Sequence, residues 1–248
     1  MKAFVEEYPE FRKLSGSVSK HVAVVSELSR VVDARSLLTV SELEQMIACN
    51  SDHSEAVENL ERLFYNREAN VAPEDLLRCV LLYSLRYEQH SGNRTARFLN
   101  MLEERGLDPQ LLHVAAALKR YAGAEVRGGD LFKSKSILSM FSRAVAELKG
   151  GVKGVTNIYT QHIPQIIETL NDILKCKLSE KDYPFQGGVV VRDRPQEIIV
   201  FFVGGVTFEE AYAVQRLVNA TPSLNITLGG THVHNSKSFM QDVLALSS

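Results

Sequence analysis

The chain has 248 residues, 45% hydrophobic and 23% charged, and its 28 Lys and Arg against 30 Asp and Glu give a formal net charge of −2. This composition excludes a disordered or fibrous protein. Without a basic excess, binding to nucleic acid by bulk electrostatics is not expected. The longest apolar run, around residues 198–203, is too short to span a bilayer, and the N-terminus does not read as a secretory signal. We therefore expect a cytoplasmic protein.

The first 150 residues show the periodicity of successive helices. An early helix of about five turns is predicted from apolar residues that recur at steps of three and four, with polar residues largely off that face. Pro73 is expected in the first turn of a second helix, followed by Glu74 and Asp75 near the positive end of the helix dipole. Because apolar residues cover most of that helix, it should be central to the core. The first stripe consists of Val18, Val22, Val25, Leu28 and Val32.

Other helix starts can be placed from local signals. The segment 41–44 fits a capping box, and Asp52 or Ser51 can cap the next helix. Further helices are predicted at about 96–105, 109–121 and 135–148. The glycine-containing segment 150–154 then breaks the helical pattern. We place a domain boundary there, with a helical domain at 1–152 and a second unit at 153–248.

The second unit is predicted to contain a βαβ element. Residues 197–203 have the composition of a fully buried strand, Thr207 and Glu210 can cap a helix, and residues 226–228 begin a second strand. The two strands should be parallel. Two parallel strands cannot cover both of their faces or close both edges, so the sheet is expected to be completed by other strands. The fold class is thus mainly α with a partial α/β part.

Two Gly-Gly pairs follow the predicted strands, at 204–205 and 229–230. Neither has the spacing of a phosphate-binding motif, and tight turns, with Asn235 or Ser236 as the cap of a following helix, are the simpler interpretation. A nucleotide-binding or sugar-transfer enzyme that uses these loops is the alternative function. His232 and His234 could share a face of an extended segment, but we expect no metal site because no third ligand is apparent nearby. No catalytic motif is present, so neither an enzyme nor a cofactor is expected.

Four longer strings carry a resemblance to a known family. The chain is similar to the Sec/Munc (SM) proteins, which act with syntaxins and other SNAREs in vesicle fusion, and most similar to their endosomal, vacuolar-protein-sorting branch. The strings are EYPEFRKLSGSVSKH at 7–21, VTNIYTQH at 155–162, RDRPQEIIVF at 192–201 and LGGTHVHNSKSF at 228–239.

The resemblance implies an incomplete SM-protein arch. Residues 1 to about 150 match the later part of the family's inserted helical domain, and the remainder matches the second part of its parallel-sheet domain. The chain is then expected to be a C-terminal fragment, with the missing strands supplied by the upstream half of the protein.

The resemblance also implies a function and a binding surface. Residues 2–35 match the second arm of a helical hairpin that meets SNAREs, so a syntaxin-class SNARE and the assembled SNARE bundle are the expected partners, at endosome and Golgi membranes. The candidate contact residues are Phe11, Leu14, Val18 and Lys20. Val18 also belongs to the apolar stripe, so packing within the protein is an equally open interpretation. Pro9 and Gly16 are positions where this arm could bend.

Overall fold

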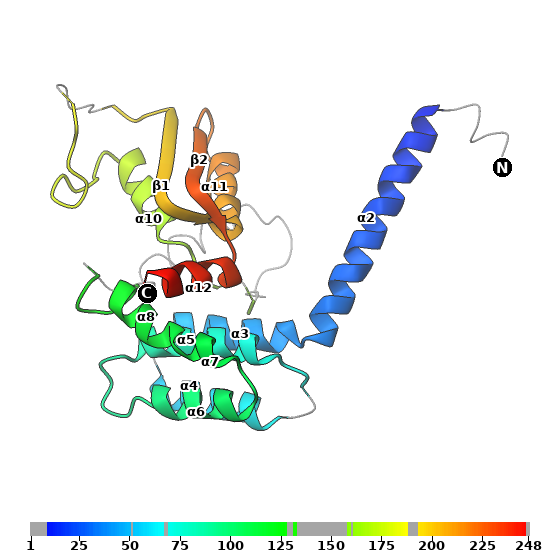
Figure 1. Cartoon of the computed structure of the whole chain (residues 1–248). Coiled ribbons are helices and arrows are strands. Elements are labelled where there is room, and N and C mark those ends of the chain that lie inside the picture. Colours follow the sequence, from blue (N-terminus) through cyan, green and yellow to red (C-terminus); the bar gives the residue numbers. More distant parts are fainter. Residues whose placement is uncertain are drawn as a thin grey trace.

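The computed structural model describes residues 9–50, 52–66, 69–127, 131–132, 158–159, 161–187 and 193–246, and side chains from residue 16 onward. Helix α2 (Pro9–Ala34) projects from the body, and α12 (Ser236–Ala245) lies between a layer of helices and a two-stranded sheet (Figure 1). The predicted fold class, mainly α with a partial α/β part, is confirmed. The helix expected at 135–148 and the boundary expected at 150–154 lie outside the described residues.

The projecting helix is longer than the periodicity indicated. It begins at Pro9 and has 26 residues. Proline is tolerated in a first turn because its missing N–H would have no partner there. The helix continues through Gly16 without a break. Neither Pro9 nor Gly16 bends the arm, which is one uninterrupted helix from Pro9 to Ala34.

The helical layer is built around α5 (Pro73–Arg86). Leu76, Leu77 and Val80 are fully buried in it, which confirms the predicted central helix. Pro73 stands in its first turn as expected. The helices that surround it are α3 (Leu37–Cys49), α4 (His53–Tyr65), α6 (Thr95–Glu104), α7 (Pro109–Leu112) and α8 (Val114–Ala122).

The predicted helix starts in this layer are partly right. Asp52 caps α4, since its side chain accepts hydrogen bonds from the backbone N–H groups of Ser54 and Glu55. The capping box at 41–44 is wrong, because Ser41 lies inside α3, which starts at Leu37 after Ser36 in a left-handed conformation with φ 49°. The chain turns from α2 into α3 at Ser36, and Val40, just before Ser41, is already fully buried in the core, so the helix begins earlier than its capping signal.

The α/β part contains β1 (Glu197–Thr207), α11 (Phe208–Ala220) and β2 (Asn225–His234), preceded by α10 (Ile166–Leu174). The strands pair in parallel, with Glu197 opposite Asn225, which confirms the βαβ prediction. Thr207 and Glu210 form the predicted capping box at the start of α11.

Only one face of the sheet is covered. On β1, alternate residues pack with α10 and α11 in a small apolar core, among them Ile198, Val200 and Phe202. The intervening Ile199 and Val203 are 83% and 92% exposed. The prediction that β1 is fully buried is therefore wrong for this chain, because no described segment lies over the second face. A strand with apolar residues on both faces is typical of the interior of a larger parallel sheet.

Both glycine pairs lie inside strands, so the predicted tight turns are wrong. Gly204 and Gly205 stand at an irregularity in the pairing of β1 with β2, where Gly204 has φ 128°, a conformation that side chains disfavour. A Cβ on Gly205 would lie 1.6 Å from Cδ2 of His234. These glycines thus allow a bulge and a close approach of an imidazole to the backbone of β1.

Two contacts join the sequence-distant parts. Met240 and Val243 of α12 are buried in the same core as the helical layer. The side-chain oxygen of Gln45 in α3 accepts hydrogen bonds from the backbone N–H groups of Gln161 and His162, at 2.8 and 2.7 Å. Burial lowers the pKa of the His162 imidazole. The division into 1–152 and 153–248 stays a prediction. The last helix of the second unit, α12, packs in the core of the first unit. Among the described residues, no helix is long and apolar enough to cross a membrane.

Candidate functional site

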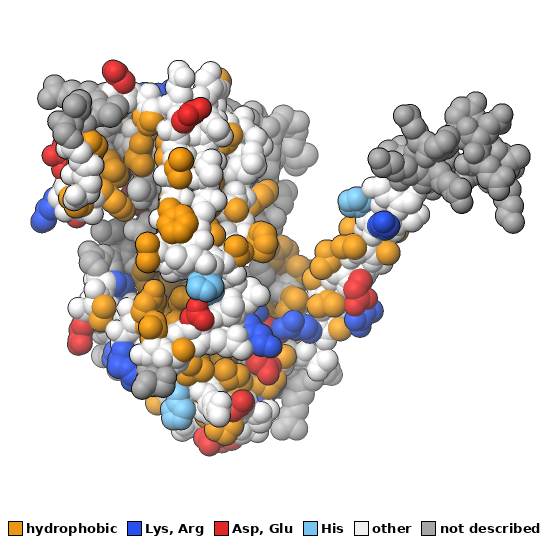
Figure 2. All heavy atoms as spheres, turned by 45° about the horizontal axis from the view of Figure 1, so that its top comes forward, with side chains coloured by type: hydrophobic (Ala, Val, Ile, Leu, Met, Phe, Trp, Pro, Cys, Tyr) orange, Lys and Arg blue, Asp and Glu red, His pale blue; other side chains and the backbone are white. Residues whose placement is uncertain are grey.

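The most distinctive surface is the apolar face of α2. Val18, Val22, Val25 and Leu28 are each more than half exposed, and Figure 2 shows hydrophobic side chains along the projecting helix. Val24 is 58% exposed as well, but it lies about 200° around the helix from Val22 and so outside this face. We call the set Val18, Val22, Val25 and Leu28 the α2 stripe. The predicted periodicity is present, but the stripe is not packed on the described body.

Helical geometry explains why these side chains form one surface. Positions 18, 22 and 25 are spaced by four and three residues, so they lie on one side of a helix that turns about 100° per residue. The opposite side is polar. Arg30 donates hydrogen bonds of 2.8 and 2.6 Å to the Glu27 carboxylate, and this bond lowers the pKa of Glu27. An apolar stripe backed by a polar side can bind another helix.

Two of the four candidate contact residues, Val18 and Lys20, have described side chains, and these lie on different sides of α2. Val18 is 57% exposed on the stripe. Lys20 is also exposed, but two residues along a helix correspond to about 200°, so it lies on the opposite side from Val18. The positions of Phe11 and Leu14 follow the same stripe by helical spacing, while their side chains lie outside the described residues. The assignment of all four residues to a SNARE contact stays a prediction.

An ion-pair cluster holds the base of α2 against the helical layer. The guanidinium of Arg35, just after α2, donates hydrogen bonds to both carboxylate oxygens of Asp75, two of them 2.7 Å long. Arg78 donates to Asp75 at 2.5 Å and to Glu44 of α3 at 2.9 Å. We call Arg35, Glu44, Asp75 and Arg78 the α2 brace. It links the end of α2 to both α3 and α5.

The buried member of the α2 brace is Asp75, whose side chain is only 1% exposed. Burial of a carboxylate is unfavourable unless charged hydrogen-bond donors compensate for the lost water, and here two guanidinium groups do so. The amide of Asn70 adds a hydrogen bond to the carbonyl of Ala34, at 3.1 Å. Sequence analysis assigned Asp75 only to the helix dipole, because nothing local connects it with Arg35, 40 residues earlier.

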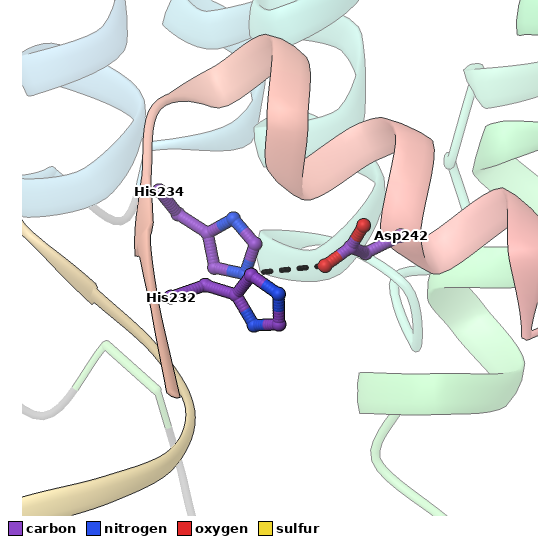
Figure 3. A group of neighbouring side chains, drawn as sticks. All are labelled: His232, His234 and Asp242. Atoms are coloured by element: carbon purple, nitrogen blue, oxygen red, sulfur yellow. Dashed lines mark ion pairs between the residues drawn. The ribbon is translucent and has the colours of Figure 1, made fainter. Parts of the chain in front are cut away.

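A second group of polar side chains lies where β2 meets α12. His232 and His234 come from the end of the strand and Asp242 from the helix (Figure 3). The donor atoms of the three residues all lie within 4.8 Å of one another. The expectation that no third ligand lies near the histidines is therefore wrong. Asn235, one of the two expected caps, starts α12 and turns Ser238 and Asp242 to one face.

The alternative function through the glycine pairs has no geometric support. A phosphate-binding loop joins the end of a strand to a helix N-terminus. Gly204 and Gly205 instead lie within β1, and Gly229 and Gly230 lie within β2. Gly205, Gly229 and Gly230 take part in the pairing of β1 with β2, so these segments do not form such loops.

Comparison with known proteins defines the class of this chain. A family model described as the Sec1 family matches residues 1–242, so the chain belongs to the Sec1 family. The resemblance to SM proteins is thereby confirmed.

The chain is similar to vacuolar protein sorting-associated protein 45 of several organisms. The chain is 48% identical to vacuolar protein sorting-associated protein 45 of Homo sapiens over 245 residues, covering 99% of this chain and 42% of the relative. It is 43% identical to the homologue of Arabidopsis thaliana, covering 98% of this chain and 42% of the relative. The chain thus spans about two fifths of the length of these relatives.

Solved structures agree with this placement. A structure described as the SM protein Vps45 in complex with the Qa SNARE Tlg2 matches with a TM-score of 0.79 and 42% identity, covering 98% of this chain and 42% of that one. A second structure, of the SM protein Vps45, matches with a TM-score of 0.73 and 38% identity, covering 98% and 40%.

Proposed function

We propose that this chain is the SNARE-binding part of a regulator of vesicle docking and fusion in endosomal and Golgi transport. The observation that carries the proposal is the exposed α2 stripe on a projecting helix of a Sec1-family chain. A similar protein, Vps45, has been solved in complex with a Qa SNARE, Tlg2. In this proposal the stripe contacts a syntaxin-class SNARE or the assembled SNARE bundle.

The proposed mechanism is binding alone, without a chemical step. SNARE motifs lose conformational freedom when they assemble, and that ordering cost opposes assembly. A rigid apolar helix face offers anchors at helical spacing, to which a partner helix can align. The α2 brace supports this role because it holds the base of the arm in one direction. The chain therefore lowers the ordering cost by presenting a preformed surface.

The open face of β1 supports a second part of the proposal, that upstream sequence completes the sheet. Ile199, Phe201 and Val203 are exposed on one face, at 83%, 63% and 92%. An exposed apolar face of this kind is normally covered in a stable protein. Because the matched relatives are more than twice as long as this chain, the length needed for further strands is available in them. We place the complete protein at endosome and Golgi membranes, held there through its SNARE partners.

Hydrogen–deuterium exchange tests where the partner binds. Addition of a syntaxin-class SNARE motif, or of the assembled SNARE bundle, is expected to slow amide exchange in residues 16–32. Amides of a projecting helix exchange through local opening, which becomes rarer when a partner covers the apolar face. Exchange in α4 and α6, on the far side of the body, should not change. Saturable binding with protection elsewhere and none in α2 would refute the proposed surface.

A further inference from the structure

The group of His232, His234 and Asp242 has the composition and spacing of a metal site. Nε2 of His234 lies 3.4 Å from Oδ2 of Asp242. Zinc binds imidazole nitrogen and carboxylate oxygen at about 2.0–2.2 Å, which places neighbouring ligands of a tetrahedral site about 3.4 Å apart. The His234–Asp242 pair therefore already has the separation that a shared cation requires. In Figure 3 the imidazole of His232 lies beside that of His234, on the side of Asp242.

The structure fixes the orientation of His234. Its side chain is only 10% exposed and packs against the backbone of Gly205, where a Cβ would overlap the ring. Nδ1 lies 3.0 Å from Oγ of Ser238. That hydroxyl donates to the carbonyl of Asn235, at 3.2 Å, so its oxygen can accept a hydrogen bond from Nδ1–H. Hydrogen bonding at one ring nitrogen is how proteins orient a metal-binding histidine.

With Nδ1–H donating to Ser238, Nε2 carries the lone pair of the ring and faces the Asp242 carboxylate. Two electron-rich atoms at 3.4 Å repel each other unless a proton or a cation lies between them. A divalent cation satisfies both atoms at once. His232 is exposed and its ring is stacked on that of His234 with centroids 5.7 Å apart. Its ligand nitrogen lies within 4.8 Å of those of His234 and Asp242, so a third ligand is within reach of the same cation.

We propose that His232, His234 and Asp242 bind a divalent cation of the zinc type. Two imidazoles and one carboxylate are a ligand set that suits zinc, and a fourth position stays open for water or a ligand from a partner. The site is independent of the proposed SNARE contact, because α2 contributes no ligand.

Binding at this site links two parts of the fold. The histidines come from the end of β2, whereas Asp242 comes from α12, whose Met240 and Val243 lie in the core of the helical layer. A cation held by all three residues thus ties the sheet to the helical layer. Because the folded state alone assembles the ligands, the cation should also stabilise the chain against unfolding.

Zinc titration of the whole chain in chelator-treated buffer tests the proposal. Calorimetry is expected to show one saturable site, and the melting temperature should rise with zinc. A site with three protein ligands loses most of its affinity for the metal when any one of them is removed. His232→Ala and Asp242→Asn should therefore each weaken zinc binding at least about tenfold. Both side chains are exposed, so neither substitution should change the melting temperature without metal.

Two control variants separate this site from other metal-binding groups. His90→Gln changes the other stacked imidazole pair, His53 and His90, whose centroids are 3.8 Å apart. Cys176→Ser removes the exposed thiol. Both variants should bind zinc like the wild type. No saturable binding, or binding that survives His232→Ala and Asp242→Asn, would overturn the proposal, as would loss of binding in Cys176→Ser.

Discussion

Replacement of Asp75 by alanine is expected to lower the free energy of unfolding by about 3 kcal/mol, since removal of one partner from a buried ionic cluster typically costs about 3–5 kcal/mol. The carboxylate is 1% exposed and is bonded by Arg35 and Arg78. Arg35 is 47% exposed, so water can solvate it after the change. Arg78 keeps Glu44 as a partner. These two compensations place the effect at the lower end of the range.

Urea unfolding monitored by circular dichroism measures this effect. Asp75→Asn should be less destabilising, because the amide can still accept one hydrogen bond from a guanidinium. Glu58→Ala is the matched control. It breaks a 3.3 Å ion pair with Arg62 whose side chains are 67% and 76% exposed, and exposed pairs contribute at most about 1 kcal/mol. If Asp75→Ala and Glu58→Ala have equal stability, the α2 brace does not hold the base of α2.

Replacement of Val18 by aspartate is expected to weaken SNARE binding about thirtyfold while the melting temperature stays unchanged. An apolar anchor at the centre of an interface contributes about 2 kcal/mol, and a charge in its place would be desolvated without a partner. Val18 is 57% exposed in the free chain, so the fold does not depend on it. Valine and aspartate have similar helix propensities, so α2 should remain helical.

The control for Val18→Asp introduces the same carboxylate on the polar side of the helix. Ser19 is exposed and lies about 100° around α2 from Val18. Ser19→Asp is expected to change the affinity for the SNARE less than about threefold, as is typical of the rim of an interface. Calorimetry and thermal melts of both variants compare the two sides. If the chain is a structural scaffold without a SNARE contact at Val18, Val18→Asp and the wild type should bind the SNARE with equal affinity.

Local chemistry was sufficient to predict much of this fold. The apolar coverage of α5 indicated its central position, and Pro73 marked its start. Thr207 with Glu210 identified the helix between two parallel strands. Each signal acts over a few residues, within which capping and periodicity determine the structure. Where a packing contact competed with such a signal, as at Ser41 inside α3, the packing contact won.

Features that depend on distant residues could not be predicted. Periodicity shows that α2 has an apolar face, but it cannot show whether another segment covers that face. The pairing of Arg35 with Asp75 spans 40 residues. The glycine pairs predict turns because glycine favours turns, whereas the strands continue through both pairs, with a bulge at Gly204.

A binding titration tests whether the chain itself binds SNAREs through α2. The chain, after a check for a cooperative melt, is titrated with a syntaxin-class SNARE motif, with the assembled SNARE bundle, and with an unrelated coiled coil. We expect saturable binding to the motif or to the bundle, and no binding to the unrelated coiled coil. A folded chain that binds neither SNARE form, or binds all three equally, would contradict this expectation.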